Sequence, residues 1–158
     1  MIILGIDPGT VRVGYGVIET EKNTLCHLAS GILLLPPHLG IMRLSAIEKE
    51  LRNLIARYRP QKVGVEKLFF SKNKKTALAV AEARGVIINT ILSYHLPLSE
   101  FTPNEVKVAA TGSGNASKQA VAKMVSLLLH ISTSKLLDDT TDALAIAIAA
   151  ANKTAPSL

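Results

Sequence analysis

Four acidic residues from three distant parts of the chain suggest a metal-dependent reaction. Asp7 and Glu66 each end a short apolar run, whereas Asp139 and Asp142 precede a long stretch of Ala, Ile and Leu. Carboxylates that converge in one cleft repel each other unless cations hold them. Oxygen ligands without a partnering His or Cys suit Mg²⁺ or Mn²⁺. Two such ions about 4 Å apart would activate water and stabilise the leaving oxygen of a phosphodiester.

Each acid also has an ordinary structural explanation. Asp7 precedes Pro8-Gly9, which predicts a tight turn that an aspartate caps. Glu66 reads as a solvated charge at a strand end. Asp138, Asp139 and Asp142 fit the cap and first turn of a helix, where the helix dipole favours carboxylates. Helical spacing allows either Asp138 or Asp139 to share a face with Asp142, so geometry alone does not choose between them.

A basic and aromatic segment directly follows Glu66. It carries two adjacent phenylalanines and several lysines, among them Phe69, Phe70, Lys72, Lys74 and Lys75. Such a loop beside a metal site would bind phosphates while one ring stacks on an unpaired base. The alternative is a solvated charge run with both rings in the core. A second basic residue, Lys118, follows a Gly-rich loop and Ser117, which predicts a helix cap near a phosphate.

Apolar periodicity predicts the elements that position these residues. Strands are expected at 2–7, 12–19, 25–35, 63–65 and 97–101. Helices are expected at 40–58, 74–94, from Thr102-Pro103 onward, at 117–129 and at 140–152. The first three strands form an antiparallel meander, and the later strands alternate with helices. This order predicts an α/β fold in which helices flank one sheet.

Composition limits the class of protein. The chain has 158 residues and a net charge of +6, which suits a nucleic-acid partner. Cys26 is its only cysteine, so an internal disulfide is excluded. No basic leader precedes the first strand, and no apolar run approaches the roughly 18 residues of a membrane span. We therefore expect a cytoplasmic protein with a single domain over 1–158 and a frayed tail after about residue 152.

The expected helix at 74–94 has apolar residues on more than one face. One stripe is enough to cover the sheet, so the surplus predicts a second buried contact. A thicker core within one subunit is the alternative explanation.

Together these motifs resemble the RuvC-type Holliday junction resolvases. The matching segments, in chain order, are Gly5-Ile-Asp-Pro-Gly-Thr10, Gly14-Tyr-Gly16, Val63–Phe70, Ala83-Arg-Gly85 and Asp139–Ala145. The resemblance implies a ribonuclease-H-like, five-stranded mixed sheet with three antiparallel and then two parallel strands. It also implies a homodimer and Mg²⁺-dependent paired nicking of four-way DNA junctions, with two ions per subunit and Mn²⁺ as a substitute.

The resemblance assigns roles residue by residue. It implies that Asp7, Glu66, Asp139 and Asp142 bind the metal ions, with Asp138 just outside the motif. Phe69 corresponds to the family residue that enters the junction centre, which leaves Phe70 for the core. Lys107 and Lys118 correspond to lysines near the scissile phosphate, and Lys72, Lys74 and Lys75 would add DNA contacts. A branch-migration motor complex of the RuvA and RuvB type is the implied partner.

Three other families or functions compete for the same residues. The actin, Hsp70 and sugar-kinase group shares a Gly-Ile-Asp-x-Gly-Thr loop, but it needs a second phosphate loop and a second lobe. An RNA-processing nuclease with a ribonuclease-H-like fold shares an early Asp-x-Gly motif. A basic protein that binds branched DNA without cutting it is the non-enzymatic alternative. The segment Glu66-Lys-Leu-Phe-Phe70 favours the resolvase over the RNA-processing nuclease, and the presence of all four acids weighs against the non-enzymatic alternative.

Overall fold

Five strands form one mixed sheet in the computed structural model, which describes residues 1–22, 24–67 and 74–153. The spatial order is β3-β2-β1-β4-β5. β1 pairs antiparallel with β2, and β2 pairs antiparallel with β3. β4 and β5 run parallel to β1. The strands are β1 (Ile2–Asp7), β2 (Arg12–Glu21), β3 (Thr24–Leu34), β4 (Lys62–Glu66) and β5 (Leu98–Phe101). The predicted sheet, with three antiparallel and two parallel strands, is confirmed.

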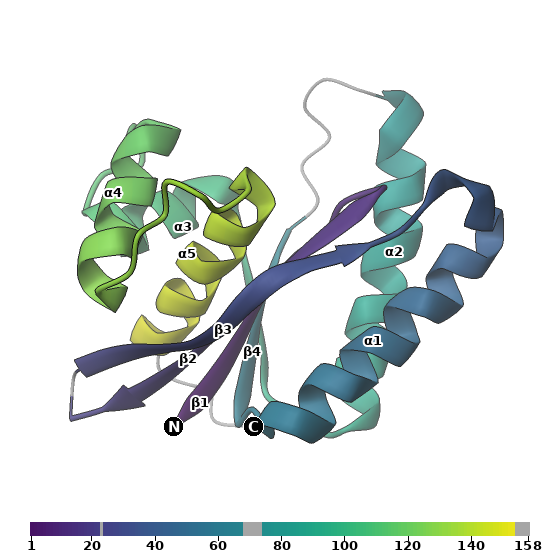
Figure 1. The fold of residues 1–158 in the computed structure, drawn as a ribbon, viewed down its shortest axis with the longest axis horizontal. Helices are drawn as coiled ribbons and strands as arrows, with labels where there is room; N and C mark the ends of the chain where they lie inside the picture. The colour runs from purple at the N-terminus through teal and green to yellow at the C-terminus, as the bar shows by residue number, and fades with distance from the viewer. Residues whose placement is uncertain (23, 68–73, 154–158) are drawn as a thin grey trace.

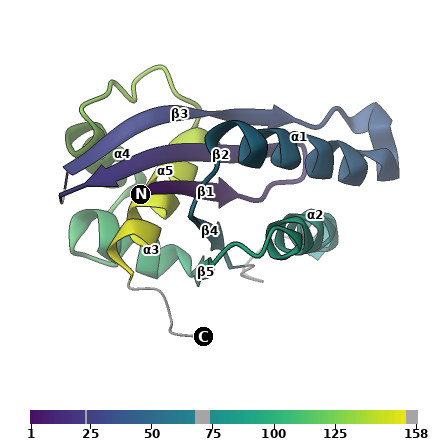
Figure 2. The same cartoon turned by 90° about the horizontal axis from the view of Figure 1, so that it is seen from below.

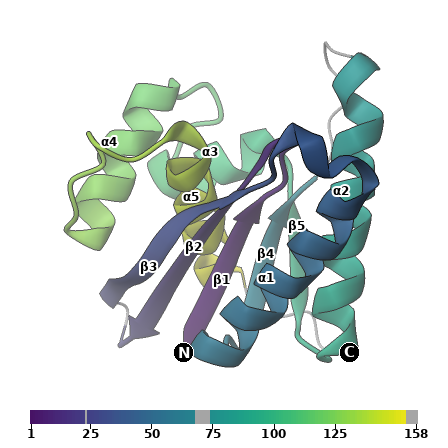
Figure 3. The same ribbon diagram turned by 45° about the vertical axis from the view of Figure 1, so that its right-hand side comes forward.

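Helices cover both faces of this sheet (Figure 1). α1 (Arg43–Tyr58) and α2 (Lys74–Ser93) lie on one side, with a 3-10 segment, η1 (Pro37–Met42), before α1. α3 (Pro103–Thr111), α4 (Lys118–Leu129) and α5 (Asp138–Asn152) lie on the other. Figures 2 and 3 both show α2 near the edge of the sheet that is formed by β4 and β5.

Strand alternation divides the core into two apolar layers. Successive side chains of a strand point to opposite faces. Ile3 accordingly packs in the layer of α3, α4 and α5, whereas Leu4 and Ile6 pack in the layer of α1 and α2. All three are at most 1% exposed, and each such burial contributes about 1.5–3 kcal/mol. The central strand is therefore fixed from both faces.

Local side-chain caps start two of the helices. Thr102 Oγ1 accepts a hydrogen bond from the Glu105 backbone N–H at 3.2 Å, and the Thr102 N–H donates to Glu105 Oε2 at 2.7 Å. This reciprocal capping box begins α3 where the sequence predicts it. Ser117 Oγ accepts from the Ala120 N–H at 3.1 Å and begins α4, as predicted.

The last helix is fixed at its C-terminal end by a buried lysine. Lys62 Nζ, on β4, donates to the carbonyl oxygen of Ala150 at 2.6 Å and also to that of Lys153. These carbonyls end a helix and have no intrahelical donor. Burial lowers the pKa of Lys62, and the charge of Lys153 lowers it further.

The apolar composition of α2 contradicts the prediction about membrane spans. The window Thr76–Ser93 has 18 residues and a mean hydropathy of 1.3, so by length and composition alone it reaches the threshold for a membrane span. The prediction that no apolar stretch approaches this length is wrong for α2. Within this helix Ala83, Ile87 and Ile91 pack in the apolar layer with α1, whereas Leu78 and Leu92 are exposed.

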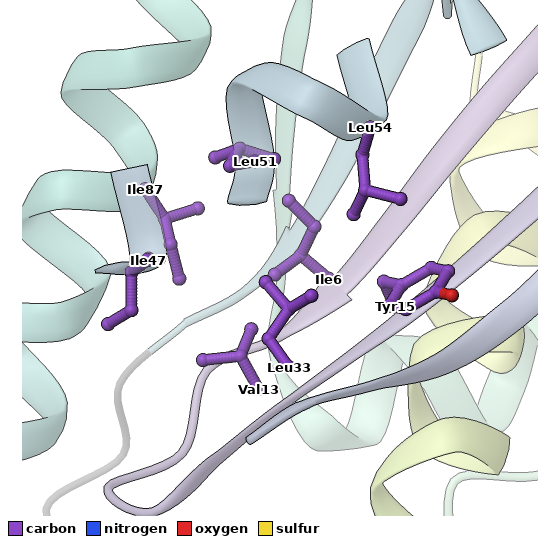
Figure 4. Close-up of a pocket in the computed structure, with 8 residues that line it drawn as sticks. All are labelled: Ile6, Val13, Tyr15, Leu33, Ile47, Leu51, Leu54 and Ile87. Carbon is purple, nitrogen blue, oxygen red and sulfur yellow. The ribbon is translucent and has the colours of Figure 1, made fainter. Parts of the chain in front are cut away.

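An apolar pocket lies between α1, α2 and the sheet (Figure 4). Its lining comes from β1, β2, β3 and both helices, namely Ile6, Val13, Tyr15, Leu33, Ile47, Leu51, Leu54 and Ile87. The pocket leaves no space for a water molecule. It is thus part of the packed layer on the face opposite α5.

Candidate active site

Strand alternation directs Asp7 and Glu66 toward α5. Ile3 packs in the α5 layer, so Gly5 and Asp7 share its face of β1. Val63 and Val65 pack in the opposite layer, so Glu66 also faces α5. β1 and β4 are parallel neighbours, and Ile6 is aligned with Val65. The two carboxylates therefore leave adjacent strand ends on one face, and a side-chain hydrogen bond joins them.

α5 brings the other two acids to the same place. It crosses β1 and β2 at glycines: a Cβ on Gly5 would lie 2.1 Å from the Ala143 carbonyl oxygen, and one on Gly14 would lie 2.0 Å from that of Asp139. Because β2 residue Gly14 is aligned with Asp7, this contact seats the first turn of α5 beside Asp7. Backbone-to-backbone contact thus sets the position of the acids on α5.

The start of α5 differs from the predicted one. The helix begins at Asp138, so Asp142 lies in the second turn and not in the first. Leu137 occupies the N-cap position, without a side-chain cap hydrogen bond. The prediction that Asp138 caps the helix is therefore wrong. Asp138 does lie in the first turn, beside the positive end of the helix dipole, as predicted. Similarly, Pro8-Gly9 forms no hydrogen-bonded turn, and the chain bends at Thr10 and Val11.

The carboxylates perturb one another strongly. Burial, together with the charges of Glu66, Asp142 and Asp139, raises the pKa of Asp7 to about 8. Burial also raises the pKa of Glu66, with an added contribution from Asp142. The pKa of Asp142 is raised by burial, although Lys118 opposes that shift. This cluster holds a proton near neutral pH and favours the binding of a cation.

Two basic side chains lie against the acids. Lys118 Nζ, at the start of α4, lies 3.4 Å from Asp142 Oδ2 and 3.9 Å from Asp138 Oδ2. The Asp142 charge raises the pKa of Lys118. Arg12 Nε lies 3.0 Å from Asp139 Oδ2, yet this pair lacks hydrogen-bond geometry, and Asp139 Oδ2 has no hydrogen-bond partner in the described part of the chain. This role of Arg12 was not predicted, because nothing near it in the chain indicates that Asp139 is its neighbour.

The acid cluster suits metal ions in its chemistry. Asp7, Glu66, Asp139 and Asp142 offer only oxygen donors, and one buried oxygen of Asp139 lacks a donor. Within residues 1–22, 24–67 and 74–153, no three His, Cys, Asp or Glu side chains are drawn together tightly enough to enclose an ion. Arg12 and Lys118 instead pair with two of the acids.

The remaining predicted residues make no described contact with the acids or lie outside the described part of the chain. Lys107 is a half-buried residue of α3, and no ion pair or hydrogen bond in the described chain links its side chain to the acids. Lys74 and Lys75 are the first two residues of α2. Phe69, Phe70 and Lys72 lie outside the described residues.

Comparisons with known proteins agree with this architecture. A family model described as "Crossover junction endodeoxyribonuclease RuvC" matches residues 3–150. A relative with that description from Heliobacterium modesticaldum is 46% identical over 153 residues, which cover 96% of this chain and 94% of the relative. The solved structure of Thermus thermophilus RuvC superposes with a TM-score of 0.88 at 30% identity, covering 96% and 93%. The structure titled "T. thermophilus RuvC in complex with Holliday junction substrate" gives a TM-score of 0.89 at 30% identity and the same coverage.

The sheet order, with carboxylates at the ends of the neighbouring strands β1 and β4, defines a nuclease of the ribonuclease-H-like class. Within that class, the chain belongs to the RuvC family of crossover junction endodeoxyribonucleases. Nucleases of this family are metal-dependent.

Proposed function

We propose that this protein resolves four-way DNA junctions by hydrolysing one phosphodiester in each of two opposite strands. The observation that carries the proposal is the cluster of Asp7, Glu66 and Asp142 beside Lys118, in a chain matched over 3–150 by the RuvC family model. The solved complex of the Thermus thermophilus relative with a Holliday junction substrate supports this choice of substrate.

The acids and Lys118 have different roles in hydrolysis. Asp7, Glu66, Asp139 and Asp142 would hold two Mg²⁺ ions, for which Mn²⁺ substitutes. When bound, such ions supply an activated water and stabilise the leaving oxygen. Lys118 contacts the scissile phosphate, which offers its ammonium an anion in place of the Asp142 carboxylate. The products are a 5′-phosphate and a 3′-hydroxyl.

The other DNA contacts come from residues around this site. Phe69 enters the junction centre and stacks on a base, while Lys72, Lys74, Lys75 and Lys107 contact phosphates. The net charge of +6 supports an interaction with a polyanion. The protein acts as a homodimer in the cytoplasm, as one domain, with a branch-migration motor complex of the RuvA and RuvB type.

A cleavage assay on two substrates tests the proposal. A four-way junction and a linear duplex of the same sequence are incubated with Mg²⁺ or with EDTA. We expect paired nicks in the junction with Mg²⁺ and none with EDTA. Equal cutting of both DNAs contradicts the resolvase function. Tight junction binding without cutting supports the non-catalytic alternative. In a parallel assay with RNA of the same sequence, preferential cutting of the RNA supports the RNA-processing alternative.

A further inference from the structure

The backbone at Glu66 is held by an arginine from a different element. Arg84 lies on α2, and its Nε donates to the Glu66 carbonyl oxygen at 3.1 Å. Glu66 is the last residue of β4, and the pairing of β4 with β1 ends at Val65, one residue earlier. A carbonyl at the end of a strand needs a donor when the ladder stops. Arg84 supplies that donor.

The same guanidinium is anchored on the neighbouring strand. Arg84 Nη2 forms an ion pair with Glu100 Oε1 on β5. Ser99 and Phe101 are buried, and Phe101 packs in the α5 layer, so Glu100 points toward the α2 side. Its strand neighbour across the ladder is Val65. Arg84 therefore bridges the ends of β4 and β5 from α2.

A second arginine–glutamate pair, Arg43–Glu82, resembles the pair of Arg84 but makes no described contact with the acid cluster. Arg43 on α1 pairs with Glu82 on α2 at 2.6 Å, and the side chains of Arg43 and Arg84 are 19% and 20% exposed. Arg43 also donates to a backbone carbonyl, that of Gly40, in η1. Neither partner of Arg43 belongs to the acid cluster. Arg84 instead fixes the peptide group of a residue whose carboxylate is hydrogen-bonded to Asp7.

We propose that Arg84 is a positioning residue that, by holding the Glu66 peptide group, aims the Glu66 carboxylate at Asp7 and sets the metal affinity of the cluster. The proposal rests on the proposed metal-dependent function. The planar guanidinium reaches the Glu66 carbonyl with one N–H and Glu100 with another. A lysine ammonium lacks this planar fork of donors, so Arg84→Lys is not a conservative change at this position.

Metal affinity in the absence of DNA is the direct test. Mn²⁺ binding is measured by electron paramagnetic resonance for the wild type, Arg84→Gln and Arg84→Lys. Loss of a residue that orients a metal ligand typically weakens affinity or activity by about 10- to 100-fold. We expect a loss in that range for both variants, with a matching rise in the Mg²⁺ concentration for half-maximal junction cleavage. Junction binding in EDTA should change less than about twofold, because the Arg84 guanidinium is engaged by Glu66 and Glu100.

Arg43→Gln is the matched control. It removes a half-buried arginine with an ion pair and a carbonyl contact, so it should lower the melting temperature about as much as Arg84→Gln does. Its Mn²⁺ affinity should stay within about twofold of the wild type. The double variant Arg84→Gln/Glu100→Gln should bind Mn²⁺ no more weakly than Arg84→Gln alone, because both variants lose the same bridge between α2 and the ends of β4 and β5.

Two results would overturn the proposal. One is wild-type Mn²⁺ affinity in a folded Arg84→Gln variant with a lowered melting temperature, which would make Arg84 a purely structural residue. The other is additive loss in the double variant. A wild-type protein that binds Mn²⁺ but leaves junctions uncut refutes the proposed function, while the Mn²⁺ series still decides the role of Arg84.

Discussion

At the scale of single residues, the proton on Asp7 links the stability of the metal-free protein to pH. Its pKa is about 8 in the folded protein, against 3.8 as the ordinary value. The folded, metal-free protein thus retains a proton that the unfolded chain has lost. Its contribution to the free energy of unfolding is largest below pH 4 and declines as pH rises toward 8.

The Asp7→Asn variant makes this dependence measurable. Asn keeps the shape without the buried charge, so the variant should melt above the metal-free wild type at pH 8. We expect a difference of about 3 °C or more, which corresponds to about 1 kcal/mol in a domain of this size. The difference should shrink as pH falls to 5. Melting curves from pH 5 to 9 in EDTA check this, and a constant difference across that range contradicts it.

The three acids at the start of α5 differ in what surrounds them. Asp139 Oδ2 is buried beside Arg12, and Asp142 is half-buried beside Lys118, whereas the Asp138 side chain is 85% exposed. We expect Asp139→Asn and Asp142→Asn each to slow cleavage by a factor on the order of 100 or more, because metal ligands are lost. Both should still bind junctions in EDTA, since less negative charge meets the phosphates.

Asp138→Asn is the control for that pair. It loses only a 3.9 Å contact with Lys118 between exposed groups, which is worth about 1 kcal/mol at most. Its cleavage rate should stay within about fivefold of the wild type. An active Asp139→Asn beside an inactive Asp138→Asn would move the ligand by one residue.

At the scale of elements, the seating of α5 on glycines positions the site. A Cβ at Gly14 would lie 2.0 Å from the Asp139 carbonyl oxygen, so α5 must shift to admit it. We expect Gly14→Ala to destabilise the fold by about 1–3 kcal/mol, the usual cost of overpacking, and to impair cleavage because Asp139 moves. Chemical denaturation and the junction assay measure the two effects.

Gly85 on α2 is the matched glycine. A Cβ there would meet nothing within 4 Å, and the residue is exposed within a helix. Gly85→Ala should stabilise the protein by about 0.5–1 kcal/mol through the higher helix propensity of alanine. If Gly14→Ala and Gly85→Ala destabilise the protein equally, the close contact between Gly14 and α5 is not the reason for the effect of Gly14→Ala.

Much of this element-scale structure could be predicted from sequence. Apolar periodicity placed Asp7 and Glu66 at strand ends, and Thr102 and Ser117 at helix starts, because these signals are local. The start of α5 could not be predicted, since Asp138 is a better cap residue than Leu137, yet Leu137 takes the N-cap. The Arg12–Asp139 and Arg84–Glu66 contacts depend on tertiary packing, which leaves no local pattern.

At the scale of the whole molecule, α2 carries the exposed apolar residues expected of an interface. Leu78 is 70% exposed and Leu92 is 54% exposed, although the opposite side of the helix is packed against the core. We expect a dimer at micromolar concentration, because two opposite strands are cut and a two-fold axis supplies one site to each. Leu78→Glu should give a folded monomer in sedimentation experiments, with at least about tenfold weaker dimerisation.

Leu127→Glu is the comparison for that variant. Leu127 is 56% exposed on α4, which covers the other face of the sheet, so its substitution should leave the dimer unchanged. A wild-type protein that sediments as a monomer, with or without junction DNA, contradicts the dimer. Dissociation by Leu127→Glu and not by Leu78→Glu would move the interface to α4.

The path of α5 across the sheet has a consequence for protein synthesis. β1, which carries Asp7, precedes the other elements of the described chain, whereas the helix that brings Asp139 and Asp142 is the last of them. Domains emerge and fold from the N-terminus onward. In a growing chain, Asp7 and Glu66 are therefore synthesised before the other two acids. We therefore expect a nascent chain to lack nuclease activity until α5 has emerged and packed against Gly5 and Gly14.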